Sequence, residues 1–155
     1  MSTATATEMD LETRTLRMER VFKATPQRVF DAFTKPEQVA AWWGPEGMHV
    51  ARLELNTVES GVWFTVMENG AGEQYHVSGR YLVIDPPKRL VFTWAWTNDG
   101  VRGHETEVEL TFTETEAGCR LNLVQTVFEN QDWRDDHNGG WTSSLNCLDV
   151  YLASE

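Results

Sequence analysis

Residues 133–152 read WRDDHNGGWTSSLNCLDVYL and carry the pattern of a long helix. Their large side chains recur every three or four positions, which is the spacing of one face of an α-helix. The residues on this face are Trp133, His137, Trp141, Leu145, Leu148 and Leu152. Acidic residues gather at the start of the segment, where the positive end of a helix dipole stabilises them; they are Asp132, Asp135 and Asp136. The segment therefore predicts a long C-terminal helix whose apolar face covers another layer of the protein.

The layer that this helix covers is predicted to be an antiparallel sheet. Between residues 48 and 127, short apolar segments are separated by clusters of turn residues, and no helical pattern competes. Alternation is clearest in LVFTWAWT, residues 90–97, and EVELTF, residues 107–112, where every second side chain is large and apolar. This region supplies six strands, and residues 15–22 supply one before it. Short connections favour a curved meander of about seven antiparallel strands, with one core face and one solvated face.

Two short helices are predicted after the first strand. Thr25 followed by Pro26 is a helix start, because a threonine hydroxyl caps free N–H groups and proline suits the first turn. Lys35 and Pro36 interrupt this helix and begin a second one, which ends at Gly44. Residues 1–12 are small and polar without a pattern, so we expect a disordered N-terminal tail. Residues 13–155 then form a single α+β domain.

The composition limits the kinds of partner. The 155 residues include 24 Asp and Glu against 13 Lys and Arg, a net charge of −11. Such a charge repels both phosphate backbones and anionic lipids, so we expect neither nucleic acid nor a membrane as a partner. No apolar run approaches the length of a membrane span, and the N-terminus lacks the pattern of a signal peptide. The sequence therefore predicts a cytoplasmic protein.

Several spaced motifs resemble those of one known family. The stretch RVFKATPQRVFDAFTKPEQVAAWWGPEGMHV, residues 20–50, resembles the opening of the Hsp90 ATPase activator homologue (AHSA1-like) family of the START-like (SRPBCC) helix-grip superfamily. Similar motifs follow in the same order, namely Asp85-Pro86-Pro87, Leu90 through Trp94, and Gly140-Trp141 ahead of Leu145 and Leu148. The resemblance covers nearly everything after Thr13. It implies the helix-grip fold, with a pocket between a curved sheet and the long C-terminal helix.

Aromatic residues predict what lines such a pocket. The chain has seven tryptophans, most of them on predicted core faces or beside them. Each one taken singly is more readily explained by packing, but the set matches the apolar lining of a ligand pocket. Periodicity and the geometry of the family together give these candidate ligand-binding residues: Trp42, Met48, Phe64, Tyr75, Trp94, Phe112, Trp133, His137, Trp141 and Leu145.

His137 is also the candidate catalytic residue. It lies on the inward helix face, and an ordinary histidine pKa near 6.5 suits a proton donor or acceptor. The alternative is a histidine at the core edge that bonds a backbone carbonyl or water. Gly139 and Gly140 follow, and each glycine inside a helix costs about 1 kcal/mol relative to alanine. We favour a structural reason, that they let the helix pass close to a strand or mark its start, over the alternative that they leave volume for a ligand.

Patterns of other catalytic and metal-binding sites are missing from the sequence. His49, His76 and His104 are dispersed and show no metal-ligand spacing. No serine lies in a nucleophile elbow, and the glycines form neither a dinucleotide-binding motif nor a phosphate-binding loop. We therefore expect no metal and no cofactor.

Three functions are compatible with these patterns. We favour a module that binds a small apolar molecule in the pocket, because the aromatic interior comes without an assembled catalytic set. The first alternative is an enzyme that acts on a hydrophobic or polyketide-like substrate in the same pocket, as some members of the superfamily do, with His137 holding the proton. The second, which the family name implies, is a co-chaperone-like partner of Hsp90. A homodimer through a sheet edge or an exposed aromatic patch is left open.

Overall fold

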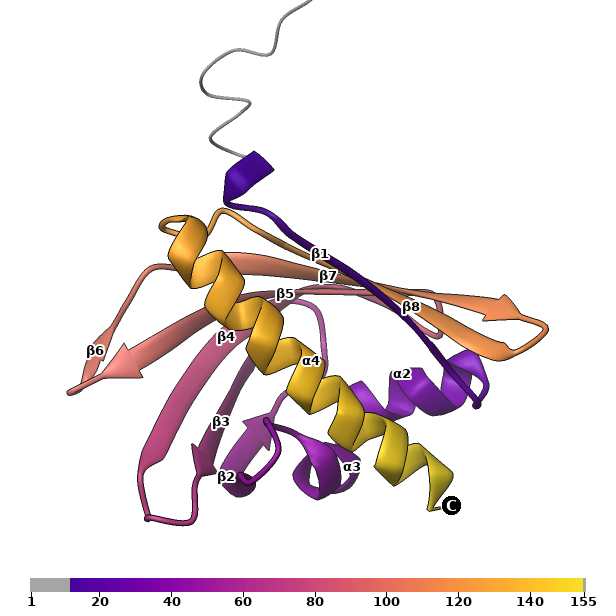
Figure 1. Cartoon of the computed structure of the whole chain (residues 1–155), viewed down its shortest axis with the longest axis horizontal. Helices are drawn as coiled ribbons and strands as arrows, with labels where there is room; N and C mark the ends of the chain where they lie inside the picture. Colours follow the sequence, from indigo (N-terminus) through magenta and orange to yellow (C-terminus); the bar gives the residue numbers. More distant parts are fainter. Residues whose placement is uncertain (1–11, 155) are drawn as a thin grey trace, which may run out of the picture.

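The structure, a computed structural model, describes residues 12–154 as a curved sheet with one long helix across its concave side (Figure 1). The predicted N-terminal tail lies outside these residues apart from Glu12. The helices are α2 (Pro26–Thr34), α3 (Pro36–Trp42) and α4 (Gln131–Ala153). The strands are β1 (Leu16–Phe22), β2 (His49–Leu55), β3 (Val62–Glu68), β4 (Gln74–Asp85), β5 (Arg89–Asn98), β6 (Val101–Arg102), β7 (Thr106–Thr115) and β8 (Gly118–Thr126). The α+β helix-grip architecture predicted from the sequence is confirmed.

The eight strands found within residues 12–154 form one antiparallel sheet. Its order is β1-β8-β7-β5-β4-β3-β2, and β6 pairs with the end of β5. The sheet has one strand more than predicted, because the two-residue β6 lies in a segment expected to be only a turn. β1 pairs with β8 from Leu16 opposite Gln125 to Phe22 opposite Cys119. The first and last strands of the chain are therefore neighbours, and the other connections form the predicted meander.

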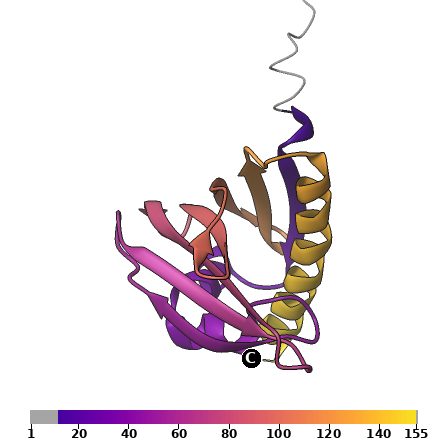
Figure 2. The same cartoon turned by 90° about the vertical axis from the view of Figure 1, so that its left-hand side faces the viewer.

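The sheet curves around α4 (Figure 2). The pairing of β4 with β5 shifts register between Tyr81 and Val83, a bulge of the kind that increases local twist. Nearby, Gly79 approaches β5 so closely that an added Cβ would overlap the carbonyl oxygen of Thr93. Only glycine fits such an approach of two backbones.

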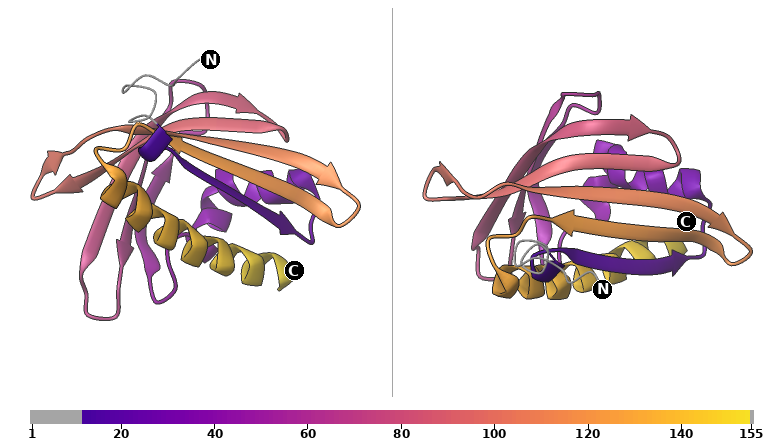
Figure 3. Two further views of the ribbon diagram at one scale, coloured as in Figure 1. Left: turned by 45° about the horizontal axis from the view of Figure 1, so that its top comes forward. Right: turned by 90° about the horizontal axis from the view of Figure 1, so that it is seen from above.

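The two short helices begin as the sequence predicts. The Thr25 hydroxyl accepts a hydrogen bond from the backbone N–H of Arg28, 3.1 Å away, and Pro26 lies in the first turn. Lys35 ends α2 and precedes Pro36, the first residue of α3. Both helices lie toward the C-terminal end of α4, where they close one end of the concave side (Figures 1 and 3).

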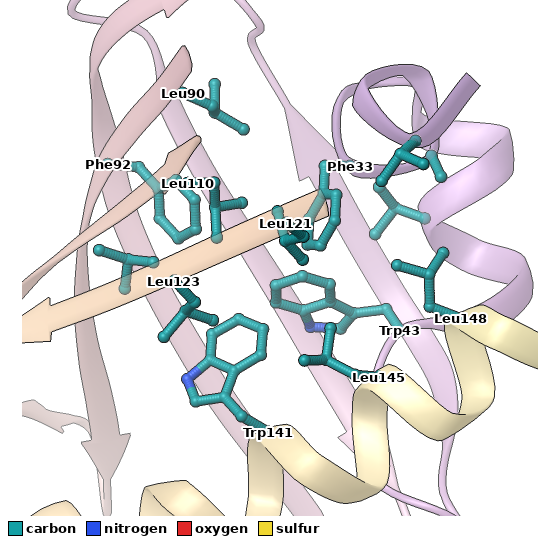
Figure 4. Packing of buried hydrophobic residues seen from close by; sticks show 14 of the residues in the cluster. Phe33, Trp43, Leu90, Phe92, Leu110, Leu121, Leu123, Trp141, Leu145 and Leu148 are labelled. Atoms are coloured by element: carbon teal, nitrogen blue, oxygen red, sulfur yellow. The ribbon is translucent and has the colours of Figure 1, made fainter. Parts of the chain in front are cut away.

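The C-terminal half of α4 packs on a dense core. Leu145 and Leu148 are buried and point from the helix toward the sheet (Figure 4). Deeper in this core, the Phe112 ring meets Phe30 edge to face at 5.3 Å and Phe33 at 5.9 Å. A void of about 20 Å³ remains next to Phe33, which is space for about one water molecule. The core beneath this half of the helix leaves no room for a ligand, although a groove of about 480 Å³ lies beside it, between α3, β2 and α4.

Candidate functional site

A pocket of about 330 Å³ opens beside the N-terminal half of α4. It lies between this helix, the ends of β3, β4 and β5 that are nearest to it, and the loop from α3 to β2. Five of the seven tryptophans line it, Trp43, Trp94, Trp96, Trp133 and Trp141. The other lining residues are Gly44, Pro45, Met67, Tyr75, Asn98, Asp136, His137, Gly140 and Ser144. The pocket is therefore rich in aromatic rings and has few polar groups.

Strand β5 supplies the floor of the pocket. Trp94 and Trp96 are two residues apart, so both side chains face the concave side, and their ring centroids lie 5.5 Å apart. The Trp94 ring also contacts Trp141 of α4, with centroids 5.3 Å apart. The floor is thus an aromatic surface that continues from the sheet to the helix.

Trp43 separates the pocket from the packed core. It is the C-cap residue of α3, and its indole N–H donates a hydrogen bond to the Thr65 hydroxyl on β3, 3.1 Å away. Its ring contacts Trp141 edge to face, with centroids 5.8 Å apart. The same ring borders the pocket on one side and the small core void on the other. Trp43 therefore limits how far the pocket extends under α4.

A buried chain of hydrogen bonds fixes Trp141. Its indole N–H donates to Oε1 of Gln125 at 2.8 Å, and the amide of Gln125 donates to the Thr106 hydroxyl at 2.8 Å. Gln125 is completely buried, so its polar atoms need partners within the protein. The chain orients Trp141 and attaches α4 to β8 and β7.

His137 links α4 to β5 as a neutral imidazole. The Trp96 indole N–H donates to Nε2 of His137 at 2.9 Å, so the imidazole proton is on Nδ1, which donates to the Trp133 carbonyl oxygen at 2.8 Å. Burial lowers the pKa of His137, and the bond to the Trp133 carbonyl and the charge of Asp136 oppose that shift only in part. Both ring nitrogens are occupied. This geometry suits the positioning of two pocket tryptophans better than proton transfer.

Five of the ten predicted ligand-binding residues come together in the pocket, namely Tyr75, Trp94, Trp133, His137 and Trp141. Tyr75 and Trp133 lie at its mouth, with 38% and 40% of their surface exposed. Trp94 and Trp141 are buried at its base. The long helix and β5 thus hold most of the predicted residues that reach the pocket.

The other five predicted residues lie outside the pocket. Trp42 turns toward α2, where its indole N–H donates to the Ala32 carbonyl oxygen at 2.8 Å. Phe112 and Leu145 belong to the packed core. Met48 borders a separate groove between α3, β2 and the C-terminal half of α4.

Phe64 lies outside the pocket because β3 presents its other face inward. Trp63, Thr65 and Met67 are buried on the concave side, so Phe64 points to the opposite side. There the Arg52 guanidinium lies over its ring, 5.5 Å from the centroid. Neighbouring apolar residues on both faces of β3 concealed which face is inward.

The prediction also omitted nine residues that line the pocket, which are Trp43, Gly44, Pro45, Met67, Trp96, Asn98, Asp136, Gly140 and Ser144. Alternation identifies two of them, since Trp96 follows Trp94 by two positions and Met67 shares the inward face of β3. Helical spacing identifies Gly140 and Ser144, which lie one turn after other lining residues of α4. Gly44 and Pro45 come from a loop, where no period applies.

The two helix glycines leave open space. Helix α4 begins at Gln131, so Gly139 and Gly140 lie inside it. Outside its own helix, a Cβ added at either position would meet no described atom within 4 Å. Our structural explanation was therefore wrong, because neither glycine marks the helix start or allows a close approach to a strand. Gly140 lines the pocket, where the missing side chain adds volume, and Gly139 is exposed.

Within residues 12–154, no group of three or more His, Cys, Asp or Glu side chains is placed to hold a metal ion. The described helices also include none that is long and apolar enough to cross a membrane.

A curved antiparallel sheet that holds a long C-terminal helix, with a pocket between them, defines a helix-grip protein. Residues 23–153 match the family model described as activator of Hsp90 ATPase homolog 1-like protein. The chain therefore belongs to the AHSA1 family, as its motifs predicted.

Solved structures are similar over nearly the whole chain. The AHSA1 protein from Silicibacter pomeroyi is 37% identical, with 90% of this chain and 97% of that chain covered and a TM-score of 0.84. A protein from Chromobacterium violaceum is 28% identical, with 88% and 95% covered and a TM-score of 0.79. A protein from Arthrobacter aurescens, 20% identical with 94% and 90% covered and a TM-score of 0.82, supports the fold alone. No curated protein matches the chain.

Proposed function

We propose that the protein binds a small, largely apolar molecule in the tryptophan-lined pocket. The proposal depends on the contrast between the two halves of α4. The first half borders a pocket of about 330 Å³ that five tryptophans line. The second half packs on a core whose void measures about 20 Å³, and the groove of about 480 Å³ beside it is bordered by exposed residues such as Val150. Ligand pockets of proteins typically have volumes of about 300–1,000 Å³. A chain that fills one half of its interior so closely, and leaves the other open, has space of the size that a small guest needs.

The mouth of the pocket gives further support. The large rings of Trp133 and Tyr75 are partly exposed to solvent, with 40% and 38% of each residue's surface accessible. Covering apolar surface is favourable by about 25 cal/mol per Å². A guest that contacts both rings would gain this stabilisation.

The enzyme alternative has weaker support. Both ring nitrogens of His137 bond to protein groups, at 2.9 Å and 2.8 Å, and the imidazole is neutral. A role in proton transfer would require one of these bonds to break. The Hsp90 alternative rests on the description of the family rather than on a contact surface within residues 12–154.

Native mass spectrometry of the protein purified from its own cells tests the proposal. The wild type is expected to carry a bound small molecule. Gly140→Leu places a side chain in the pocket and should abolish that binding. Gly139→Leu, which adds the same side chain on the exposed side of the same helix, should keep it.

Two negative results together would contradict the proposal. One is that the wild-type protein carries no guest. The other is that isothermal titration calorimetry with a panel of fatty acids, isoprenoids and aromatic hydrocarbons detects no binding that Gly140→Leu removes.

A further inference from the structure

We infer that the guest of this pocket is an organic cation, a bulky ammonium joined to an apolar body. The inference rests on the proposed function and adds the charge of the ligand. It follows from three properties of the lining: its ionisable groups, the hydrogen bonds of its indole rings, and the charge of the chain around it.

The ionisable groups of the lining favour a positive guest. Asp136 is the one carboxylate among the lining residues, and no lysine or arginine is among them. His137 adds no positive charge, because its Nε2 accepts the hydrogen bond from Trp96 and the ring is neutral. An anionic guest would therefore lose its hydration without meeting an opposite charge, which is costly.

Three of the five tryptophans that line the pocket have committed their polar edges to the protein, whereas the buried indole N–H of Trp94 has no hydrogen-bond partner within the described residues. The indole N–H groups of Trp43, Trp96 and Trp141 donate to Thr65, His137 and Gln125 at 3.1, 2.9 and 2.8 Å. What these three rings still offer a guest is their π surface. The negative face of an indole attracts a cation more strongly than any other side-chain ring does. The lining therefore resembles an aromatic cage with one carboxylate beside it.

The size of the ammonium follows from its hydration. A compact primary ammonium holds its water strongly, whereas methyl groups on nitrogen weaken that hydration and add apolar contact. A pocket with about 330 Å³ of space and few polar groups suits the methylated form with an attached ring or chain. The net charge of −11 on the chain draws cations toward the protein at low salt.

Three probes of similar bulk separate the effect of charge from the effect of burying apolar surface. Benzyltrimethylammonium is the cation, neopentylbenzene is its neutral carbon isostere, and 4-tert-butylbenzoate is an anion of similar bulk. Chemical shifts of the indole N–H groups in ¹⁵N-labelled protein report binding at the pocket. We expect the cation to bind about tenfold more tightly than the isostere, and the benzoate to shift no pocket signal.

A matched pair of variants assigns the preference to one carboxylate. Asp136→Asn should weaken binding of the cation about three- to tenfold and leave the isostere unchanged. Asp132→Asn removes the same charge from the same helix at a residue that does not line the pocket, and should leave both affinities unchanged. Trp133→Leu keeps an apolar side chain at the partly exposed mouth and should weaken the cation more than the isostere.

The outcomes separate this inference from the proposed function. If the isostere binds at the same indole signals as tightly as the cation, the inference is overturned and the proposed function stands. The same holds if Asp136→Asn and Asp132→Asn weaken the cation equally. If the ligand that co-purifies with the protein is an acid, the inference is again overturned. If no probe shifts a pocket signal, no ligand co-purifies and the calorimetric panel shows no binding, the proposed function fails, and the inference fails with it.

Discussion

The indole N–H of Trp96 points at Nε2 of His137 from a distance of 2.9 Å, so the strand β5 and the helix α4 are joined by a bond that exists only while the imidazole is neutral. Protonation would place an N–H on both sides of this contact. The opposite ring nitrogen already donates to the Trp133 carbonyl oxygen. The wall of the pocket is thus coupled to the protonation of one buried histidine.

This coupling predicts a pH dependence of stability. Burial lowers the pKa of His137 in the folded protein, whereas in the unfolded chain the pKa returns to about 6.5. As pH falls below about 6.5, the unfolded state takes up a proton that the folded state does not, so the free energy of unfolding decreases. The decrease stops below the folded-state pKa. Urea denaturation of the wild type from pH 8 to pH 5 measures it.

His137→Gln is the reference for this measurement, because a glutamine oxygen accepts from Trp96 and does not titrate. The difference in free energy of unfolding between wild type and variant should shrink as pH falls through this range. If the free energies of unfolding of the two proteins change in parallel with pH, His137 does not contribute to the pH dependence of stability.

The buried chain through Gln125 predicts a large loss on substitution. Gln125→Leu leaves the Trp141 indole N–H without its partner at 2.8 Å, and the Thr106 hydroxyl keeps only the bond that it donates to the Trp94 carbonyl oxygen at 3.2 Å. An unpaired buried polar group costs about 1–3 kcal/mol, so we expect a loss of about 3 kcal/mol. Thr106→Val alone breaks the same Gln125–Thr106 bond, so the double variant loses this bond only once and should be more stable than the sum of the single losses predicts. Simple additivity in chemical denaturation would contradict this account.

The helix glycines predict a gain in stability. Outside their own helix, a methyl group at Gly139 or Gly140 meets no described atom within 4 Å. Each change to alanine should therefore stabilise the protein by about 1 kcal/mol, the difference in helix propensity. Thermal unfolding of the two variants measures this. A loss of stability in Gly140→Ala alone would mean that the pocket side of the helix is more closely packed than the structure shows.

A third glycine predicts the opposite effect. Gly79 lies where an added Cβ would overlap the Thr93 carbonyl oxygen on the neighbouring strand. Gly79→Ala must separate β4 from β5 or distort both. We expect a loss of at least about 3 kcal/mol, in the range of severe core substitutions. A Gly79→Ala protein with wild-type stability in urea would show that this approach is not needed.

The buried Tyr81 leads us to expect that the protein loses stability at alkaline pH. Burial raises the pKa of Tyr81 to about 12, and the hydrogen bond with the Thr57 side chain opposes this shift. Between pH 10 and that value the unfolded chain releases the proton while the folded chain keeps it, so stability falls as pH rises. The full effect is about 2–3 kcal/mol. Tyr81→Phe should lose less stability than the wild type between pH 9 and 11, and equal losses would contradict the prediction.

The sequence predicted pocket residues correctly in the elements where the side-chain spacing is regular, which are α4 and β5. Helical spacing in α4 and alternation in β5 are enough to place Trp94, Trp133 and Trp141 on facing surfaces, because the aromatic rings of each element recur on one of its faces. These two elements hold most of the lining.

The prediction of pocket residues failed where either of two adjacent residues could face the pocket or the core. Trp42 and Trp43 are adjacent at the end of α3, and helical spacing does not decide which ring turns to α2 and which to the pocket. Thr65 is buried on β3 although Phe64 beside it is far more apolar. The Trp43 hydrogen bond to Thr65 explains that choice, and it is a contact between distant segments that no local pattern contains.

The contacting indoles have an optical consequence. The ring centroids of Trp43, Trp94 and Trp141 lie between 5.3 and 6.0 Å from one another, close enough for the rings to share excitation energy. Light absorbed by one ring is therefore emitted by the group, and a molecule that quenches one member dims its neighbours as well. The intrinsic fluorescence of the unlabelled protein should therefore change when a molecule occupies the space between these rings. This signal can be used to screen for ligands without a label.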